Sequence, residues 1–177
     1  KFNNGDELTA DDVMFNFEQW LDPDVGSSML NQLSYLRGMQ DVERVDDYTV
    51  KFYLQRVEAP FLANLAMDFA AIVSPTAVAE YGAEFKNNPV GTGPFEFVSW
   101  TKDDNIVLDA NKDYWGEGPY LDRLILRVIP DATARYLALK NGEVDVIDFP
   151  SAEDLEEMEA DANIELIQQP GLNVGYL

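Results

Sequence analysis

The chain has 177 residues, and its 33 acidic side chains outnumber its 12 basic ones, which gives a formal net charge of −21. This charge repels nucleic-acid phosphates and anionic lipids, so we expect neither nucleic-acid binding nor attachment to a membrane surface. Histidine and cysteine are both absent, which excludes disulfides, imidazole bases, zinc fingers and cysteine nucleophiles within this chain.

The composition nevertheless predicts a folded core, because 46% of the residues are hydrophobic and 12% are aromatic. The longest apolar run covers residues 69–73 and is far too short to span a membrane. The chain begins with lysine rather than an initiator methionine, which we interpret as a sign that it is cut from a longer protein. Acids are densest in residues 153–165, and we interpret this stretch as a solvated helix face rather than a docking site for a basic partner.

The first half of the chain shows local patterns for helices and one hairpin. Thr9 precedes a predicted helix whose apolar positions 13, 17, 20 and 21 share one face. Residues 48–54 alternate between apolar and polar after a turn at 46–47, which predicts a hairpin with a partner strand around Val42 and Val45. A second helix is predicted from residue 59, and a third opens at Ser74 with Pro75 in its first turn. The sequence does not decide the secondary structure of residues 27–41.

The second half predicts an α/β layer. A turn cluster at 88–94 leads into a second hairpin, with strands at 95–97 and 106–108. A strand at 124–129, a helix at 134–140 capped by Asp131, and a strand at 144–147 together predict a crossover with a parallel strand pair. Ser151 is expected to cap a last, acidic helix, and residues 164–167 are expected to form a final strand.

The sequence contains no recognisable set of catalytic residues. The loop at 91–93 lacks both the third glycine of a dinucleotide fingerprint and the lysine of a P-loop, so we interpret it as a turn. The acidic stretches at 22–26 and 103–105 lack the remaining ligands of a calcium loop. We therefore expect no metal and no cofactor. A hydrolase domain that uses a pair of carboxylates remains the alternative, because every window holds several acids and none is singled out.

Several segments resemble the peptide and nickel class of solute-binding proteins, which are the extracytoplasmic receptors of ABC importers and are called family 5. The similar segments are residues 1–5, 8–13, 45–50, 88–95, 114–116, 128–135 and 142–145. Residues 58–70 and 170–177 resemble the dipeptide-binding branch of that family in particular. The segments follow the order found in the family and cover most of the chain.

The resemblance implies a mixed α/β fold, namely an incomplete lobe of the type II periplasmic-binding-protein fold with an accessory subdomain. Residues 1–90 would be the accessory subdomain, and residues 91–177 would be part of the first main lobe, with the second lobe outside this chain. The implied protein is not an enzyme. It is a periplasmic or cell-surface receptor that captures a short peptide, which is a dipeptide in this branch, and passes it to the membrane subunits of a permease. Nickel chelates, haem and sugars are other ligands of the family, and fold alone does not choose among them.

The resemblance also suggests which residues line the ligand cleft. Met67, Asp68 and Phe69 match the dipeptide branch and follow a predicted helix, and Gly171, Leu172 and Asn173 precede the crossing towards the second lobe. We predict that the two segments border one concavity, with Tyr35 as a further wall residue. The alternative is that Phe69 and Leu172 belong to the core, that Asp68 is a local cap and that Tyr35 is ordinary surface. The groups for the ends of the peptide are expected from the second lobe.

Overall fold

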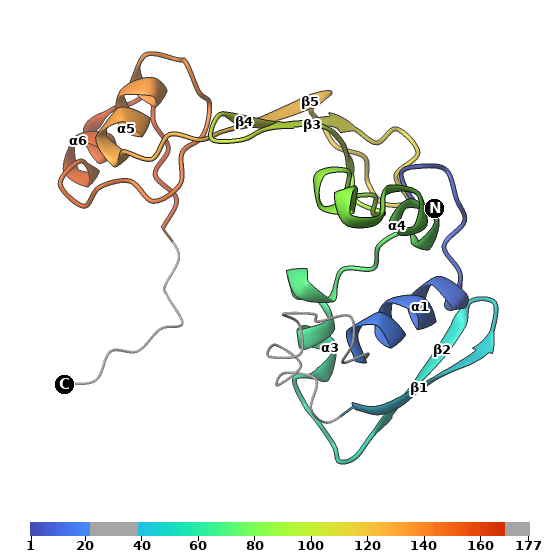
Figure 1. Cartoon of the computed structure of the whole chain (residues 1–177). Helices are drawn as coiled ribbons and strands as arrows, with labels where there is room; N and C mark the ends of the chain where they lie inside the picture. Colours follow the sequence, from blue (N-terminus) through green and yellow to red (C-terminus); the bar gives the residue numbers. More distant parts are fainter. Residues whose placement is uncertain (22–38, 169–177) are drawn as a thin grey trace. The chain divides into compact units, whose positions relative to one another are not determined.

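The computed structural model describes residues 1–21 and 39–168, which form a mixed α/β structure with small sheets. The chain divides into two compact units, Lys1–Leu126 and Arg127–Leu177, and each unit is described by itself (Figure 1). Within the described ranges, no helix combines the length and the apolar composition that a membrane crossing requires.

The first unit holds most of the regular structure. Its elements in chain order are α1 (Ala10–Leu21), β1 (Met39–Asp46), β2 (Thr49–Leu54), α3 (Phe61–Leu65), the 3-10 helix η3 (Asp68–Ala70), α4 (Pro75–Tyr81), the 3-10 helix η4 (Gly82–Asn87), β3 (Phe95–Thr101), β4 (Asn105–Ala110) and all but the last residue of β5 (Arg123–Arg127). The helices predicted after Thr9, near residue 60 and at Ser74 are therefore confirmed, as are both hairpins.

Helix α1 begins directly after Thr9, as the sequence predicts, and Asp12 caps it. The Asp12 carboxylate accepts hydrogen bonds from the backbone N–H of Thr9 at 2.7 Å and from the Thr9 hydroxyl at 2.9 Å. Thr9 therefore donates to Asp12, which is the reverse half of a capping box. The acids in the first turn also lie at the positive end of the helix dipole.

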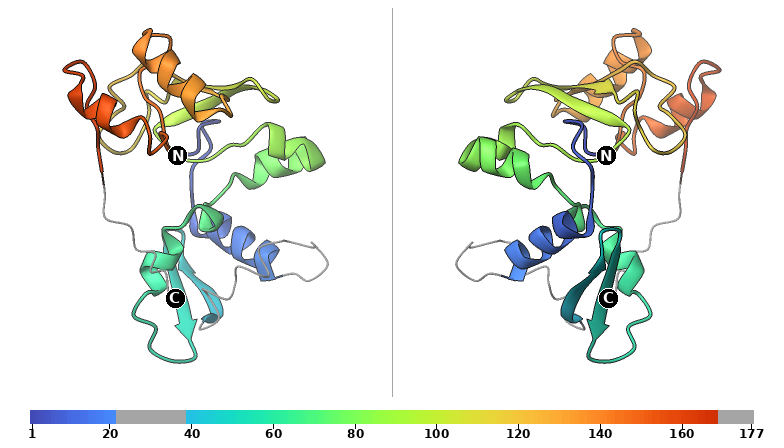
Figure 2. Two further views of the ribbon diagram at one scale, coloured as in Figure 1. Left: turned by 90° about the vertical axis from the view of Figure 1, so that its left-hand side faces the viewer. Right: turned by 90° about the vertical axis from the view of Figure 1, so that its right-hand side faces the viewer.

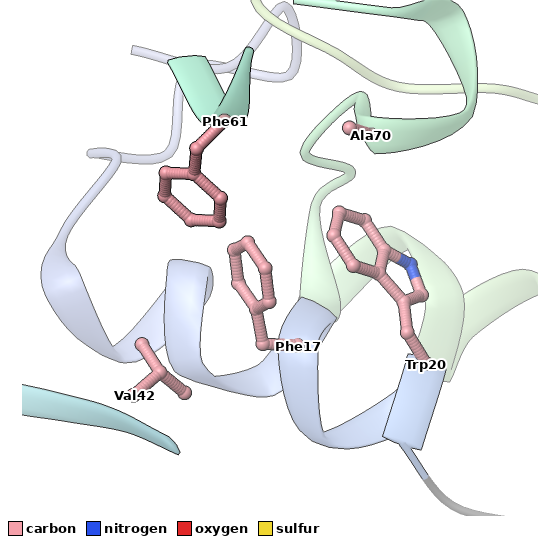
Figure 3. Packing of buried hydrophobic residues seen from close by; sticks show 5 residues of the cluster. All are labelled: Phe17, Trp20, Val42, Phe61 and Ala70. Atoms are coloured by element: carbon pink, nitrogen blue, oxygen red, sulfur yellow. The ribbon is translucent and has the colours of Figure 1, made fainter. Parts of the chain in front are cut away.

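The first unit has an aromatic core between α1, the hairpin and α3. Strands β1 and β2 pair antiparallel, and Figures 1 and 2 show α1 lying along this hairpin. The ring of Phe17 lies between those of Phe61 and Trp20 in Figure 3 and makes an edge-on contact with Trp20 at a centroid distance of 4.6 Å. Edge-on pairs add stabilisation beyond the area that they bury. The buried cluster is Phe17, Trp20, Val42, Phe61 and Ala70.

Hydrogen bonds of two asparagines join segments of the first unit that are distant in sequence. The Asn16 side chain donates to the Val73 carbonyl at 2.9 Å and accepts from the Val73 N–H at 3.1 Å, so it pairs with Val73 as a second strand would. Asn3 donates through its backbone to the Gly91 carbonyl at 2.8 Å and through its side chain to the Phe95 carbonyl at 3.0 Å. The N-terminal segment is thereby fixed to the turn cluster at 88–94.

The second sheet has the order β3-β4-β5, and β3 and β4 pair antiparallel with one irregularity between Phe97 and Ser99. Arg123 on β5 forms a bidentate ion pair with Asp109 on β4, with N–O distances of 2.6 and 2.9 Å. The bound guanidinium lowers the pKa of the Asp109 carboxyl.

The second unit contains α5 (Ala132–Lys140) and α6 (Leu155–Ala160), which lie close together in Figures 1 and 2. Asp131 caps α5 as predicted, because its carboxylate accepts from the Ala134 N–H at 2.8 Å. Ser151 does not cap α6; its hydroxyl accepts from the Glu153 N–H at 3.3 Å in the turn before the helix, and Asp154 occupies the N-cap position.

The strands predicted at 144–147 and 164–167 are wrong, and with them the crossover and its parallel pair. Both segments are described as irregular, and neither has a sheet partner within the described ranges. A strand exists only where a neighbouring backbone accepts and donates its hydrogen bonds, which an alternating sequence cannot supply by itself. Val146 and Ile167 are accordingly exposed.

Candidate functional site

The structure describes only part of the predicted cleft. Tyr35, Gly171, Leu172 and Asn173 lie outside the described residues. The predicted proximity of residues 67–69 to residues 171–173 therefore stays a prediction.

Met67 and Asp68 lie on the surface of the first unit at a sharp change of backbone direction. Met67 is extended (φ −76°, ψ 152°) between α3 and η3, and it is 41% exposed. Asp68 is also exposed, and Phe69 follows it in η3. The Met67 carbonyl accepts from the Ala70 N–H at 2.9 Å, which closes the single turn of η3.

Buried residues on both sides hold this turn in place. Phe61 at the start of α3 and Ala70 at the end of η3 belong to the aromatic core, and Leu65 and Ile72 pack against it. The backbone of residues 66–69 therefore rises from the core to the surface and returns within a few residues. Such a short, anchored excursion presents an apolar thioether and a carboxylate to solvent without the flexibility of a long loop.

A second candidate group lies in the second unit, around Phe149. The backbone of Phe149 has φ of +52°, in the left-handed region that side chains other than glycine rarely adopt. Its side chain is 87% exposed, so packing of the ring does not account for this conformation. A residue held this way costs about 1–3 kcal/mol and persists only where its surroundings fix it, most often in a binding or active site.

Arg135 supplies that restraint. One terminal nitrogen of its guanidinium donates to the carbonyls of Ile129 at 2.8 Å and Pro130 at 2.9 Å, and the other donates to the Phe149 carbonyl at 3.0 Å. The planar fork of arginine reaches three carbonyls at once, which a lysine ammonium on a flexible stem does not. Arg135 thus ties the start of α5 to the exposed aromatic residue.

Sequence reasoning missed Phe149 for a physical reason. It precedes Pro150, and a residue before proline normally adopts an extended conformation. Arg135 is within one of the segments that carry the family resemblance, but its contacts with backbone carbonyls leave no signature in the sequence.

Three carboxyl groups among the described residues have a lowered pKa. The backbone N–H of Tyr48 lowers the pKa of Asp46, the Arg123 guanidinium lowers that of Asp109, and the Lys140 ammonium lowers that of Glu157. A carboxylic acid that donates a proton near neutral pH needs a raised pKa, so these three are unsuited to that role. Among the described residues, no group of three or more acids is arranged to hold a metal ion.

Comparison with known proteins identifies the protein family to which the chain belongs. The family model "Bacterial extracellular solute-binding proteins, family 5 Middle" matches residues 1–177. The chain belongs to this family. Family 5 proteins bind solutes rather than catalyse reactions, and nothing in the comparisons favours the hydrolase alternative.

The relatives are receptors of several ligand classes. A dipeptide-binding protein of Escherichia coli K12 is 41% identical over 97% of this chain, and heme-binding protein A of Haemophilus influenzae is 38% identical over 97% of it. A solved structure of a periplasmic binding protein from Helicobacter pylori, in complex with the peptide STSA, is 38% identical, covers 89% of this chain and has a TM-score of 0.79. The chain spans 34%, 34% and 33% of these three proteins, respectively, or about a third of their length.

Proposed function

We propose that this chain is part of the substrate-binding receptor of an ABC importer, which captures a short peptide outside the cytoplasmic membrane and delivers it to the permease. The observation that carries the proposal is the 41% identity with a dipeptide-binding protein over nearly the whole chain, together with the match to the family 5 model. The receptor has no catalytic activity of its own, and it works in the periplasm or at the cell surface.

The proposal includes a division of labour within the receptor. Residues 1–90 form the accessory subdomain, and residues 91–177 form part of the first main lobe. Because a two-lobed receptor gains affinity by removing its ligand from water between both walls, the 177-residue chain alone binds dipeptide very weakly. The charged partners of the peptide's amino and carboxyl ends belong to the opposite lobe.

The proposal names two candidate groups for contact with the ligand, and each is argued by itself. The first is Met67–Asp68–Phe69 together with residues 171–173 and Tyr35. The second is Phe149, whose strained backbone, exposed ring and fixation by Arg135 are typical of a residue held for contact with a ligand. An aromatic ring offers apolar contact to a peptide side chain at a small cost in side-chain entropy.

Isothermal titration calorimetry tests the function on a receptor of the relatives' full length. The ligands are the dipeptide Ala-Ala, the tetrapeptide Ser-Thr-Ser-Ala and haem. We expect micromolar or tighter binding of the dipeptide, and no comparable binding by the 177-residue chain alone. Absence of peptide binding by the long receptor would refute the proposed substrate, and haem binding without peptide binding would reassign it.

Matched variants test the contribution of Phe149. Phe149→Ser is compared with Ile167→Ser, because Ile167 is another apolar residue of the second unit with a similar exposure of 80%. Arg135→Lys is compared with Arg127→Lys, because Arg127 makes a long ion pair of 3.9 Å with Glu143. We expect Phe149→Ser and Arg135→Lys to weaken dipeptide binding about tenfold, or about 1.4 kcal/mol, while both controls bind normally. Equal affinities for all four variants would remove Phe149 from the site.

A further inference from the structure

Helix α6 carries a high concentration of negative charge for so short an element. The nine residues 153–161 contain six acids and no base, and α6 itself is six residues long. An isolated helix of this length is unstable in water, so α6 depends on the groups around it. Whether its acids stabilise or destabilise it follows from their spacing and from the charges that face them.

The spacing of the acids brings like charges together. Residues three or four positions apart are neighbours on a helix surface, and like charges at this spacing destabilise the helix. Glu157 has an acid at such a spacing on each side, namely Asp154 and Asp161. Glu156 and Glu159 form a further pair of the same kind, and both side chains are exposed.

The ends of α6 do not compensate for this repulsion. Acids in the first turn face the positive end of the helix dipole, but the last turn has no base to face the negative end. Asp154 at the N-cap makes no capping hydrogen bond through its side chain, and one of its carboxylate oxygens is buried without a hydrogen-bond partner in the described ranges. Lys140 has the largest effect on the pKa of Glu157 and lowers it, whereas the charge of Asp161 at the other end raises it. The repulsion therefore reaches the residue that Lys140 binds.

Only one ion pair within the described ranges involves the acids of residues 153–161. The Lys140 ammonium at the end of α5 binds the Glu157 carboxylate. Both side chains are about half exposed, and an exposed pair contributes little to stability. The two other bases of the second unit are engaged elsewhere, since Arg127 pairs with Glu143 and Arg135 donates to backbone carbonyls. Attraction thus offsets only part of the repulsion.

Apolar burial offers α6 little further support. Among the described residues of the second unit, three apolar side chains are buried: Tyr136 and Ala138 on α5, and Met158 on α6. Helices α5 and α6 lie close together in Figures 1 and 2, and Met158 is the one buried residue of α6. With so small a core, a modest change in electrostatic repulsion is enough to shift the balance between folded and unfolded α6.

We infer that α6 is a salt-dependent element, whose helix and contact with α5 form fully only when dissolved ions screen the repulsion among its acids. Helix neighbours at these spacings are about 5–6 Å apart between Cβ atoms. The screening length is about 10 Å at 0.1 M salt and about 3 Å at 1 M, so the effect continues to grow up to molar salt. The inference does not depend on the proposed ligand, and its test uses none, so either can fail without the other.

Hydrogen–deuterium exchange measured by mass spectrometry tests the inference on the whole 177-residue chain. Exchange of α6 is compared at about 0.05 M and about 1 M sodium chloride at one pH. The internal reference is α3, because it is equally short and contains no charged residue. We expect exchange of α6 to slow about fivefold relative to α3 at the higher concentration. Choline chloride of the same ionic strength should have the same effect, because screening does not depend on the identity of the cation.

Two matched variants separate charge repulsion from other effects of salt. Glu159→Gln removes an acid that has no ion pair within the described ranges, whereas Glu157→Gln removes the acid bound by Lys140. At about 0.05 M salt we expect Glu159→Gln to slow exchange of α6 about twofold and Glu157→Gln to speed it about twofold. Both differences should disappear at about 1 M salt.

Three results would overturn the inference. The first is exchange of α6 that follows α3 at both salt concentrations. The second is a response to sodium chloride without a response to choline chloride, because it would mean that bound sodium rather than screening stabilises α6. The third is a change in the same direction for Glu157→Gln and Glu159→Gln, because loss of a charge that is attracted and loss of a charge that is repelled must have opposite effects.

Discussion

The replacement Asn16→Ala tests whether a buried amide joins α1 to the segment that follows η3. Asn16 is 2% exposed, and its side chain makes three hydrogen bonds: to the Asp12 carbonyl at 2.8 Å, to the Val73 carbonyl at 2.9 Å and from the Val73 N–H at 3.1 Å. Alanine removes all three and leaves both backbone groups of Val73 without their partner.

The magnitude follows from the groups left unpaired. A buried polar group that loses its partner costs about 1–3 kcal/mol. Val73 is only partly buried, so water recovers part of that cost for its N–H and C=O. We therefore expect the free energy of unfolding of the first unit to fall by about 2–3 kcal/mol, which is a large share of the stability of a typical domain.

Urea unfolding monitored by tryptophan fluorescence measures this loss. All three tryptophans, Trp20, Trp100 and Trp115, lie in the first unit, so the signal reports that unit alone. Glu18→Ala is the matched control, because Glu18 is exposed on the same helix, and it should change stability by less than about 0.5 kcal/mol. If Asn16→Ala also stays within about 0.5 kcal/mol of the wild type, the amide pair does not join these segments as the reasoning requires.

Three further predictions concern the second unit. Asp131→Ala removes the cap of α5 and should lower the free energy of unfolding by about 1 kcal/mol in thermal unfolding followed by circular dichroism; an unchanged melting temperature would contradict this. Gly142 ends the same helix with φ of +71°, so Gly142→Ala should cost about 1 kcal/mol while Gly142→Asn costs less, and equal stability of the two variants would contradict the backbone argument. The Lys140 ammonium lowers the folded-state pKa of Glu157, so the stabilising contribution is present above the ordinary value of 4.5 and disappears as the pH falls through the lowered pKa. Glu157→Gln should therefore melt below the wild type at neutral pH and together with it near pH 2, which is about two units below the ordinary value, and a constant difference would contradict this.

The elements that the sequence predicted correctly have signals within a few neighbouring residues. Ser74 and Pro75 open α4, and the Ser74 hydroxyl accepts from the Ala77 N–H at 3.2 Å as a cap should. The β1–β2 hairpin follows from alternation around a turn of two aspartates. In both cases the groups that satisfy the backbone are near in sequence, and the pattern therefore contains them.

The incorrect strand predictions concern segments whose pairing partner would have to be distant in sequence. The alternation in residues 144–147 has the period of a strand, but within the described ranges no neighbouring backbone pairs with it. Periodicity reports which side chains prefer burial and does not supply the second strand.

The residues of the candidate site also differ in whether a local sequence signal could predict them. Met67 and Asp68 were predicted only through resemblance, because an exposed methionine beside an aspartate has no special pattern. Phe149 could not be found at all, since its left-handed backbone depends on the Arg135 guanidinium reaching it across 14 positions of sequence.

The unpaired segment at 144–147 has a consequence for the solution behaviour of the chain. Backbone without a sheet partner, such as this segment within the described ranges, can serve as a template on which another molecule adds a strand. Asp145 and Asp148 place negative charge along this stretch, and no base lies between residues 141 and 177. Two copies that approach edge to edge therefore bring like charges together, and the acidity protects the chain against self-association. That protection is electrostatic, so it weakens as acid neutralises the carboxylates or as salt screens them.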